Sequence, residues 1–339
     1  MHVEILETSH DRPLATQRDL VQAHPSGLAS LSLPFKAGQN HEDLDHVVRR
    51  NHMFLQRYGL LQSDALPRRG LSEIVRYPAL LYPIAEDAAL DIAVDAVTWS
   101  SLWSEQYQRL CHNDDQLVDS MIWQLVDITL HRVGIQPADE APPLVWAFAD
   151  IWKREAARLS LLYQQRAATN WRRWFLCFAR DDIPDQYRDE PSLSNHPSDR
   201  YSTYSAVLGD LIEGSLKFEL PRGTYESPEV EELRDILADS MRWVSDVASA
   251  SEGNPRDGNV VSVLQKQWRL STDQAIGKVC DMHGRLMQRW CLLRDRLPHL
   301  YGTLRLDEEA RIQLQRYVMG VESLMAGHYA WHAGVAPLA

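Results

Sequence analysis

The sequence has few cysteines and no long hydrophobic run, and these absences exclude several classes of protein. The four cysteines, Cys111, Cys177, Cys280 and Cys291, lie far apart without CxxC spacing, so neither a zinc knuckle nor a disulfide framework is indicated. No stretch of 18 uncharged apolar residues is present, and the N-terminal residues lack the basic and apolar regions of a signal peptide. We therefore expect a soluble, cytoplasmic protein without a membrane span.

Positive charge is also scarce. The chain has 35 Lys and Arg residues against 47 Asp and Glu residues, a net charge of −12 and a pI near 5.5. This is the wrong sign for a protein that binds phosphate backbones, so we expect no nucleic-acid partner. The 13 histidines show no HxxxH or HExxH spacing with a third ligand, and no P-loop, GxGxxG or Ser-His-Asp pattern is present.

What the sequence does contain is enough apolar residues, at helical spacing, to build a large core. Hydrophobic residues make up 45% of the 339 residues, and they recur with the period of a helix and without the alternation of strands. The chain is therefore predicted to be all-α, with a loose N-terminal arm over residues 1–30 and one helical domain over 31–339. Helices are expected at 41–61, 84–108, 113–133, 143–179, 200–216, 228–250, 259–292 and 307–331.

A further set of residues, spread over several segments, carries a resemblance to a known family. These residues are Leu33 to Phe35, Asn40, Arg50 to Leu61, Tyr82, Pro83, Leu90, Ala93, Asp95, Trp99, Trp152, Arg158, Arg166, Gly320, Gly327 and Trp331. Together these segments resemble class I terpene synthases of the microbial type. They extend over residues 31–332, nearly the whole chain. The resemblance implies a single-domain α-helical bundle with a central apolar cavity.

The resemblance also implies a Mg²⁺ cluster that holds and ionises a prenyl diphosphate, because the charge of the leaving group must be neutralised. At the position of the family's DDxxD motif, within residues 103–108, only Glu105 carries a charge. The second motif aligns with residues 245–252, where Ser249 matches, Ser245 replaces the amide or carboxylate, and Glu252 lies one residue early. We predict a reduced Mg²⁺ site formed by Glu105, Asp246, Ser249 and Glu252.

Two arginine features of the family are missing as well. The position of the diphosphate-sensing arginine is Ser205 or Ala206, and the C-terminal Arg-Tyr pair falls on residues 337–338, which contain no arginine. We predict that Lys266 and Arg200 supply this positive charge, against the alternative that each is a solvated surface cation. The literal DDxxD at residues 181–185 contains a proline and is predicted to lie in a loop.

Aromatic residues form a further pattern. Trp99, Trp103 and Tyr107 recur every four residues, so they share one helix face, and Trp331 lies in the last predicted helix. In the family that the chain resembles, such rings line the cavity and stabilise carbocations by cation–π attraction. We predict this catalytic role for all four rings, with ordinary core packing as the alternative.

The leading functional hypothesis is an atypical class I terpene cyclase, a lyase that ionises a prenyl diphosphate and cyclises it to a sesquiterpene. Farnesyl diphosphate is the expected substrate, and magnesium the expected cofactor. One alternative is an enzyme of the same fold that acts on a different apolar polyene without metal. Another is an inactive homologue that binds an isoprenoid. The resemblance also allows a homodimer.

Overall fold

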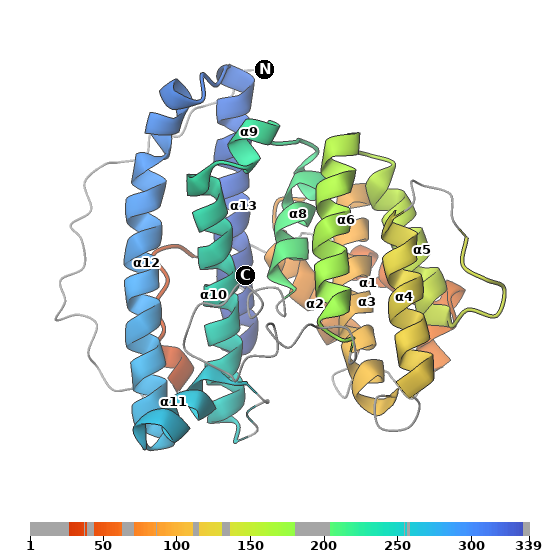
Figure 1. The fold of residues 1–339 in the computed structure, drawn as a ribbon, viewed down its shortest axis with the longest axis horizontal. Helices are drawn as coiled ribbons and strands as arrows, with labels where there is room; N and C mark the ends of the chain where they lie inside the picture. The colour runs from red at the N-terminus through yellow and green to blue at the C-terminus, as the bar shows by residue number, and fades with distance from the viewer. Residues whose placement is uncertain are drawn as a thin grey trace.

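The computed structural model describes residues 27–36, 38, 44–62, 71–85, 87–110, 115–130, 136–179, 204–253, 255 and 258–334, and every regular element among them is helical (Figure 1). Two 3₁₀ turns span Gly27–Ser30 (η1) and Leu60–Gln62 (η2). The α-helices are α1 (Leu44–Arg57), α2 (Leu71–Leu81), α3 (Asp87–Leu110), α4 (Asp115–Leu130), α5 (Pro143–Ala156), α6 (Leu161–Leu176), α8 (Ser205–Leu216), α9 (Arg222–Tyr225), α10 (Pro228–Ser251), α11 (Val260–Trp268), α12 (Thr272–Thr303) and α13 (Glu308–His332). The predicted all-α class is confirmed.

Two predicted helices are each divided in two. The helix expected at 143–179 is interrupted between α5 and α6, where the Ser160 hydroxyl accepts a hydrogen bond from the Tyr163 N–H and starts α6 as its N-cap. The helix expected at 259–292 ends at Trp268, because Arg269 adopts a left-handed conformation (φ 54°) and Ser271 begins α12 with a capping box.

Helix α2 was not predicted, and it contains Pro78. Proline in a helix interior removes one hydrogen bond and normally ends the helix. Here α2 persists because it packs against three other helices, α13, α1 and α3. Tertiary packing has therefore overridden a local breaking signal.

Helix α13 is surrounded by α2, α8 and α10, while α3 packs against α1, α2, α5 and α8. Two glycines permit the close approach of α13 to its neighbours. A Cβ at Gly320 would lie 2.4 Å from a side-chain carbon of Ile212 on α8, and a Cβ at Gly327 would lie 2.3 Å from the Leu80 carbonyl oxygen on α2. The contact at Gly320 brings α13 against α8, and the contact at Gly327 brings it directly against the backbone of α2.

The apolar side chains form two cores. The larger core joins helices α1 to α6 with α8, the first half of α10 and parts of α12 and α13. A smaller core lies where η1, α11 and the C-terminal half of α10 meet the start of α12. In the described part of the chain, no helix is both long and apolar enough to cross a membrane.

Candidate functional site

Several of the described sequence-predicted site residues lie near the ends of helices. Figure 1 shows the C-terminal ends of α3, α10 and α13 toward the lower edge of the view, with α11 beside α10. Glu105 and Tyr107 lie in the last two turns of α3, and Ser249 lies in the last turn of α10. Trp331 is the penultimate residue of α13.

Three of the four predicted aromatic residues join one packed ring cluster. Trp99 is fully buried, and its Nε1–H donates to the Leu144 carbonyl oxygen at 2.8 Å. Trp103 stacks on Trp99, with the ring centroids 6.0 Å apart, and both Trp103 and Tyr107 contact the ring of Phe178. The cluster continues through Phe148, Trp171, Trp174, Phe175 and Tyr204. Its members brace α3 against α5 and α6.

Trp331 lies apart from that cluster, in the last turn of α13. It is half-buried, and its ring centroid is 5.4 Å from that of Tyr77 on α2. The four predicted rings therefore divide into a buried group on α3 and one ring on α13.

The predicted metal ligands on α10 hold helix α11. Asp246 Oδ2 accepts the Val260 N–H at 2.9 Å, and the Asp246 carbonyl oxygen accepts the Asn259 amide at 2.9 Å. The Ser249 hydroxyl donates to the Asp246 carbonyl oxygen and accepts from the same Asn259 amide at 3.0 Å. Asn259 in turn is the N-cap of α11. These side chains therefore anchor the start of α11 to the end of α10.

The metal site predicted from Glu105, Asp246, Ser249 and Glu252 stays a prediction. No group of three His, Cys, Asp or Glu side chains in the described part of the chain is arranged to hold a metal ion. Glu105 is half-buried on α3, whereas Glu252 is exposed at the C-cap of α10. Lys266 is exposed on α11, and Arg200 and residues 181–185 lie outside the described residues.

A polar cluster that was not predicted joins α2, α10 and α13 beside Trp331. The Tyr77 hydroxyl lies 2.8 Å from His328 Nδ1, and the Ser245 hydroxyl lies 3.0 Å from His328 Nε2 and 3.2 Å from His332 Nε2. His328 Nε2 also lies 3.0 Å from the Met241 carbonyl oxygen. His328 is 6% exposed, whereas His332 is half-buried. Four polar side chains from three helices therefore form one continuous chain.

Burial shifts the pKa values of two neighbouring members of this cluster, Tyr77 and His328, in opposite directions. It lowers the pKa of His328 well below its usual range, with the neighbouring His332 ring adding to the effect. It also raises the pKa of the Tyr77 hydroxyl. Both groups are therefore neutral near pH 7.

The sequence indicates only the two histidines of this cluster and not their partners. His328 and His332 have HxxxH spacing, which places both rings on one helix face. This spacing alone does not indicate a metal site, because no third ligand accompanies it. The actual partner is the Ser245 hydroxyl, 83 residues upstream of His328, and only the packing of α10 against α13 brings the two together.

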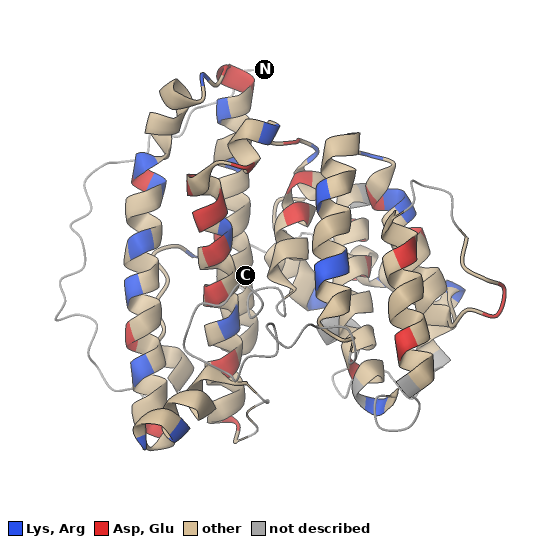
Figure 2. Ribbon diagram, in the orientation of Figure 1, with Lys and Arg blue, Asp and Glu red and all other residues tan. Residues whose placement is uncertain are grey.

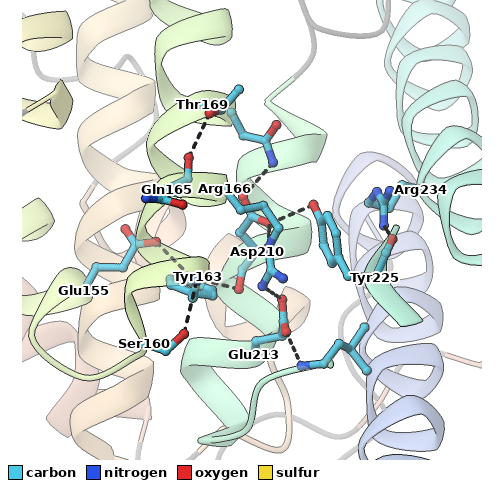
Figure 3. Close-up of polar contacts among 12 residues, drawn as sticks. Glu155, Ser160, Tyr163, Gln165, Arg166, Thr169, Asp210, Glu213, Tyr225 and Arg234 are labelled. Carbon is cyan, nitrogen blue, oxygen red and sulfur yellow. Dashed lines mark hydrogen bonds and ion pairs between the residues drawn. The ribbon is translucent and has the colours of Figure 1, made fainter. Parts of the chain in front are cut away.

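A second polar network lies among α5, α6, α8 and α9, where three carboxyl groups are buried (Figure 3). Glu155, Asp210 and Glu213 are exposed by 2%, 1% and 0%. Arg166 pairs with both Asp210 and Glu213, and its guanidinium lies 3.7 Å from the centroid of the Tyr225 ring.

Neutral donors complete this network. Glu155 accepts hydrogen bonds from the Tyr163 hydroxyl at 2.9 Å and the Trp171 Nε1–H at 3.3 Å. Asp210 accepts from the Asn170 amide at 2.7 Å. Burial raises the pKa of Glu155 to about 7 and the pKa of Glu213 to about 7, although the Arg166 charge acts in the opposite direction on Glu213. The network joins α6 to α8.

This network borders a groove of about 640 Å³ between α6 and α10. Arginines and carboxylates both line it, and so do Ser205 and Ala206, the position expected for the family's diphosphate-sensing arginine. None of the described residues predicted as metal ligands, diphosphate cations or cavity rings lines it. Figure 2 shows the same mixture of signs on a larger scale, with Lys and Arg recurring along α12 and Asp and Glu along α10. We therefore treat the groove network as structural and the α2, α10 and α13 cluster as the candidate functional site.

Comparison with known proteins identifies the family of the chain. The model of terpene synthase family 2, C-terminal metal binding, matches residues 95–289, and these residues include the ends of α3 and α10 described above. The chain belongs to this family of terpene synthases and is of the microbial class I type.

Individual relatives cover most of the chain. Pentalenene synthase of Streptomyces avermitilis is 26% identical over 84% of this chain and 86% of its own length. The (−)-β-caryophyllene synthase of Saccharothrix espanaensis is 26% identical over 85% of this chain and 83% of its own. The crystal structure of germacradien-4-ol synthase from Streptomyces citricolor matches with a TM-score of 0.77 and 25% identity, covering 89% of this chain and 99% of that one. The predicted class I fold is confirmed.

Proposed function

We propose that the protein is a terpene cyclase that converts a prenyl diphosphate, farnesyl diphosphate in the first instance, to a cyclic sesquiterpene. The observation that carries this proposal is similarity to sesquiterpene synthases across more than four fifths of the chain, together with the class I fold. The name of the Saccharothrix espanaensis relative states that it cyclises (2E,6E)-farnesyl diphosphate.

The contacts support packing roles for two of the predicted aromatic residues and cation-stabilising roles for the other two. Trp99 is held in the core by its hydrogen bond to Leu144, and Trp103 stacks on it. Trp331 and Tyr107 are half-buried, so their rings can face a bound substrate. We assign cation stabilisation to Trp331 and Tyr107, and support of the α3 face to Trp99 and Trp103.

The diphosphate requires positive charge near the helix ends. Lys266 is exposed on α11, and Asp246, Ser249 and Asn259 hold that helix against the end of α10. We keep Lys266 and Arg200 as the proposed diphosphate cations, since the predicted sensor position carries Ser205 or Ala206.

The function is tested with purified protein and geranyl, farnesyl or geranylgeranyl diphosphate, with products identified by gas chromatography–mass spectrometry. The expected result is a cyclic product from farnesyl diphosphate that is absent without protein. Absence of product from all three substrates would overturn the proposal. If a diphosphate nevertheless raised Tm, the chain would bind isoprenoids without turnover.

The role of Asp246 is tested separately with Asp246→Asn, in reactions with Mg²⁺ and with EDTA. The Asn side-chain oxygen still accepts the Val260 N–H, so α11 should stay in place, but the negative charge that a metal ligand needs is lost. On these contacts we expect unchanged turnover and only a slightly lower Tm, because the ion pair of Asp246 with Arg242 is lost. A selective loss of Mg²⁺-dependent turnover at this Tm would instead make Asp246 a metal ligand. Glu105→Gln makes the same change of charge at the predicted metal ligand on α3. If Glu105 binds Mg²⁺ as predicted, this variant should lose product formation.

A further inference from the structure

The hydrogen bonds of the α2, α10 and α13 cluster have one direction. His328 Nε2 lies 3.0 Å from the Met241 carbonyl oxygen, which can only accept, so Nε2 carries the proton. His328 Nδ1 then has the lone pair and accepts from the Tyr77 hydroxyl. The Ser245 hydroxyl accepts from His328 Nε2, and its own proton can then be donated to His332 Nε2, 3.2 Å away, when that nitrogen carries a lone pair. The order of donation is therefore Tyr77, His328, Ser245, His332.

We propose that this chain is a proton relay that ends the cyclisation, with Tyr77 removing the final proton from the substrate cation and His332 receiving it at the end of α13. This inference rests on the proposed function, because it requires a carbocation to reach the Tyr77 hydroxyl. Tyr77 is the catalytic residue, while His328, Ser245 and His332 act through it.

The transfer balances without any added reactant. The electron pair of the substrate C–H bond becomes the π bond of the product alkene, and its proton goes to the Tyr77 oxygen. The original Tyr77 proton moves to His328 Nδ1, the His328 Nε2 proton moves to Ser245, and the Ser245 proton moves to His332 Nε2. His328 ends as the opposite neutral tautomer and His332 as an imidazolium. Loss of a proton from His332 to water restores its neutral ring. His328 returns to the Nε2–H tautomer by proton exchange with water, in which Nε2 gains one proton and Nδ1 loses one, so that the net charge does not change.

The surroundings favour a charge at His332 over one at His328. The polar groups recorded around His328 are the Tyr77 hydroxyl from α2, the Ser245 hydroxyl and Met241 carbonyl from α10, and the His332 ring from α13, and none of these four is anionic. His328 is buried and is held neutral, as its lowered pKa indicates. His332 is half-buried in the last turn of α13, where the helix dipole favours a cation.

The position of Trp331 supports the role of Tyr77 as the proton acceptor. The Trp331 ring lies 5.4 Å from the Tyr77 ring, centroid to centroid, and both rings are half-buried. An aromatic face beside the proton acceptor can hold the cation while deprotonation occurs. The acceptor and the ring proposed to stabilise the cation are therefore neighbours.

The relay is tested by Tyr77→Phe and Ser245→Ala, which remove one hydroxyl each and keep the size of the side chain nearly constant. With farnesyl diphosphate, we expect kcat for the deprotonated hydrocarbon product to fall by about 100-fold in each. The cation should then be quenched by water, so the alcohol fraction of the product should rise while KM stays close to that of the unaltered protein. Ser251→Ala is the control on α10, since that hydroxyl only donates to the Val247 carbonyl oxygen within the helix. Product ratios in Tyr77→Phe and Ser245→Ala equal to those of Ser251→Ala would overturn the relay.

A second measurement tests the relay without turnover, and so separates its failure from failure of the proposed function. Long-range ¹⁵N–¹H spectra of ¹⁵N-histidine-labelled protein, with His328 assigned by His328→Gln, report which ring nitrogen carries the proton. At about pH 7, where a free histidine is mostly neutral, we expect His328 as the neutral Nε2–H tautomer. A protonated His328 or an Nδ1–H tautomer would reverse the order of donation and overturn the inference, whether or not farnesyl diphosphate is converted.

Discussion

Arg166→Met is expected to lower the free energy of unfolding by about 3–5 kcal/mol, because it leaves buried carboxyl groups without their cation. Arg166 pairs with Asp210 and Glu213, which are 1% and 0% exposed, and it packs over the Tyr225 ring. Methionine retains much of the apolar stem but none of the charge. Denaturant unfolding followed by circular dichroism measures the loss.

The loss should depend on pH in a definite direction. The pKa of Glu213 is raised by burial to about 7 in the folded protein, above the value of an unfolded glutamate. The folded state therefore binds the proton more tightly, so this contribution to stability is present at low pH and is lost as the pH rises toward 7. Without Arg166 the same effect grows, and we expect Arg166→Met to lose more stability at about pH 8 than at about pH 5.

Arg222→Met is the matched control. Arg222 pairs with Glu226 one turn away on an exposed surface, with 68% of the arginine side chain exposed, so its loss should cost less than about 1 kcal/mol. If the two variants were equally stable, the Arg166 network would not be the structural brace that its burial indicates.

Gly327→Ala is expected to destabilise the protein by about 1–3 kcal/mol through overpacking, although alanine favours helix formation. The added Cβ would lie 2.3 Å from the Leu80 carbonyl oxygen and 2.6 Å from the Leu80 carbonyl carbon. Backbone atoms cannot rotate away as a side chain can, so α2 and α13 must separate. The same separation would lengthen the hydrogen bond between Tyr77 and His328, which joins these two helices.

Gly284→Ala on α12 provides a control of opposite sign. A Cβ at Gly284 would meet nothing within 4 Å, so the higher helix propensity of alanine should stabilise the protein by up to about 1 kcal/mol. Thermal unfolding of both variants measures the difference. A Gly327→Ala variant as stable as Gly284→Ala would show that α2 and α13 pack less closely than described.

Much of the architecture could be predicted from the sequence, because helices with apolar stripes have a local signature. The helix boundaries that differ from the prediction, and the one unpredicted helix, each depend on a single residue. Ser160 and Ser271 each act as an N-cap and start a new helix within a stretch whose apolar residues keep a helical period. Helix α2 was not predicted because Pro78 normally ends a helix, and its packing against neighbouring helices stabilises it.

The candidate site was less predictable. Alignment of the family's second metal-binding motif predicted Asp246 and Ser249 as metal ligands. In the structure both side chains hold the start of α11. Spacing along a helix specifies which face a residue occupies, and does not specify which partner meets it there. The predicted site assignments for Lys266, Arg200 and the metal ligands therefore stay predictions.

The sequence by itself determined the helical class and the membership in the terpene synthase family, since both depend on residue order along the chain. It also placed His328 and His332 on one helix face. Only the tertiary structure decided that Tyr77 and Ser245 complete their hydrogen-bonded chain and that Arg166 neutralises two buried carboxyl groups. The physical reason is that hydrogen bonds and ion pairs act over a few ångströms in space, between residues separated in the sequence by 44 to 251 positions.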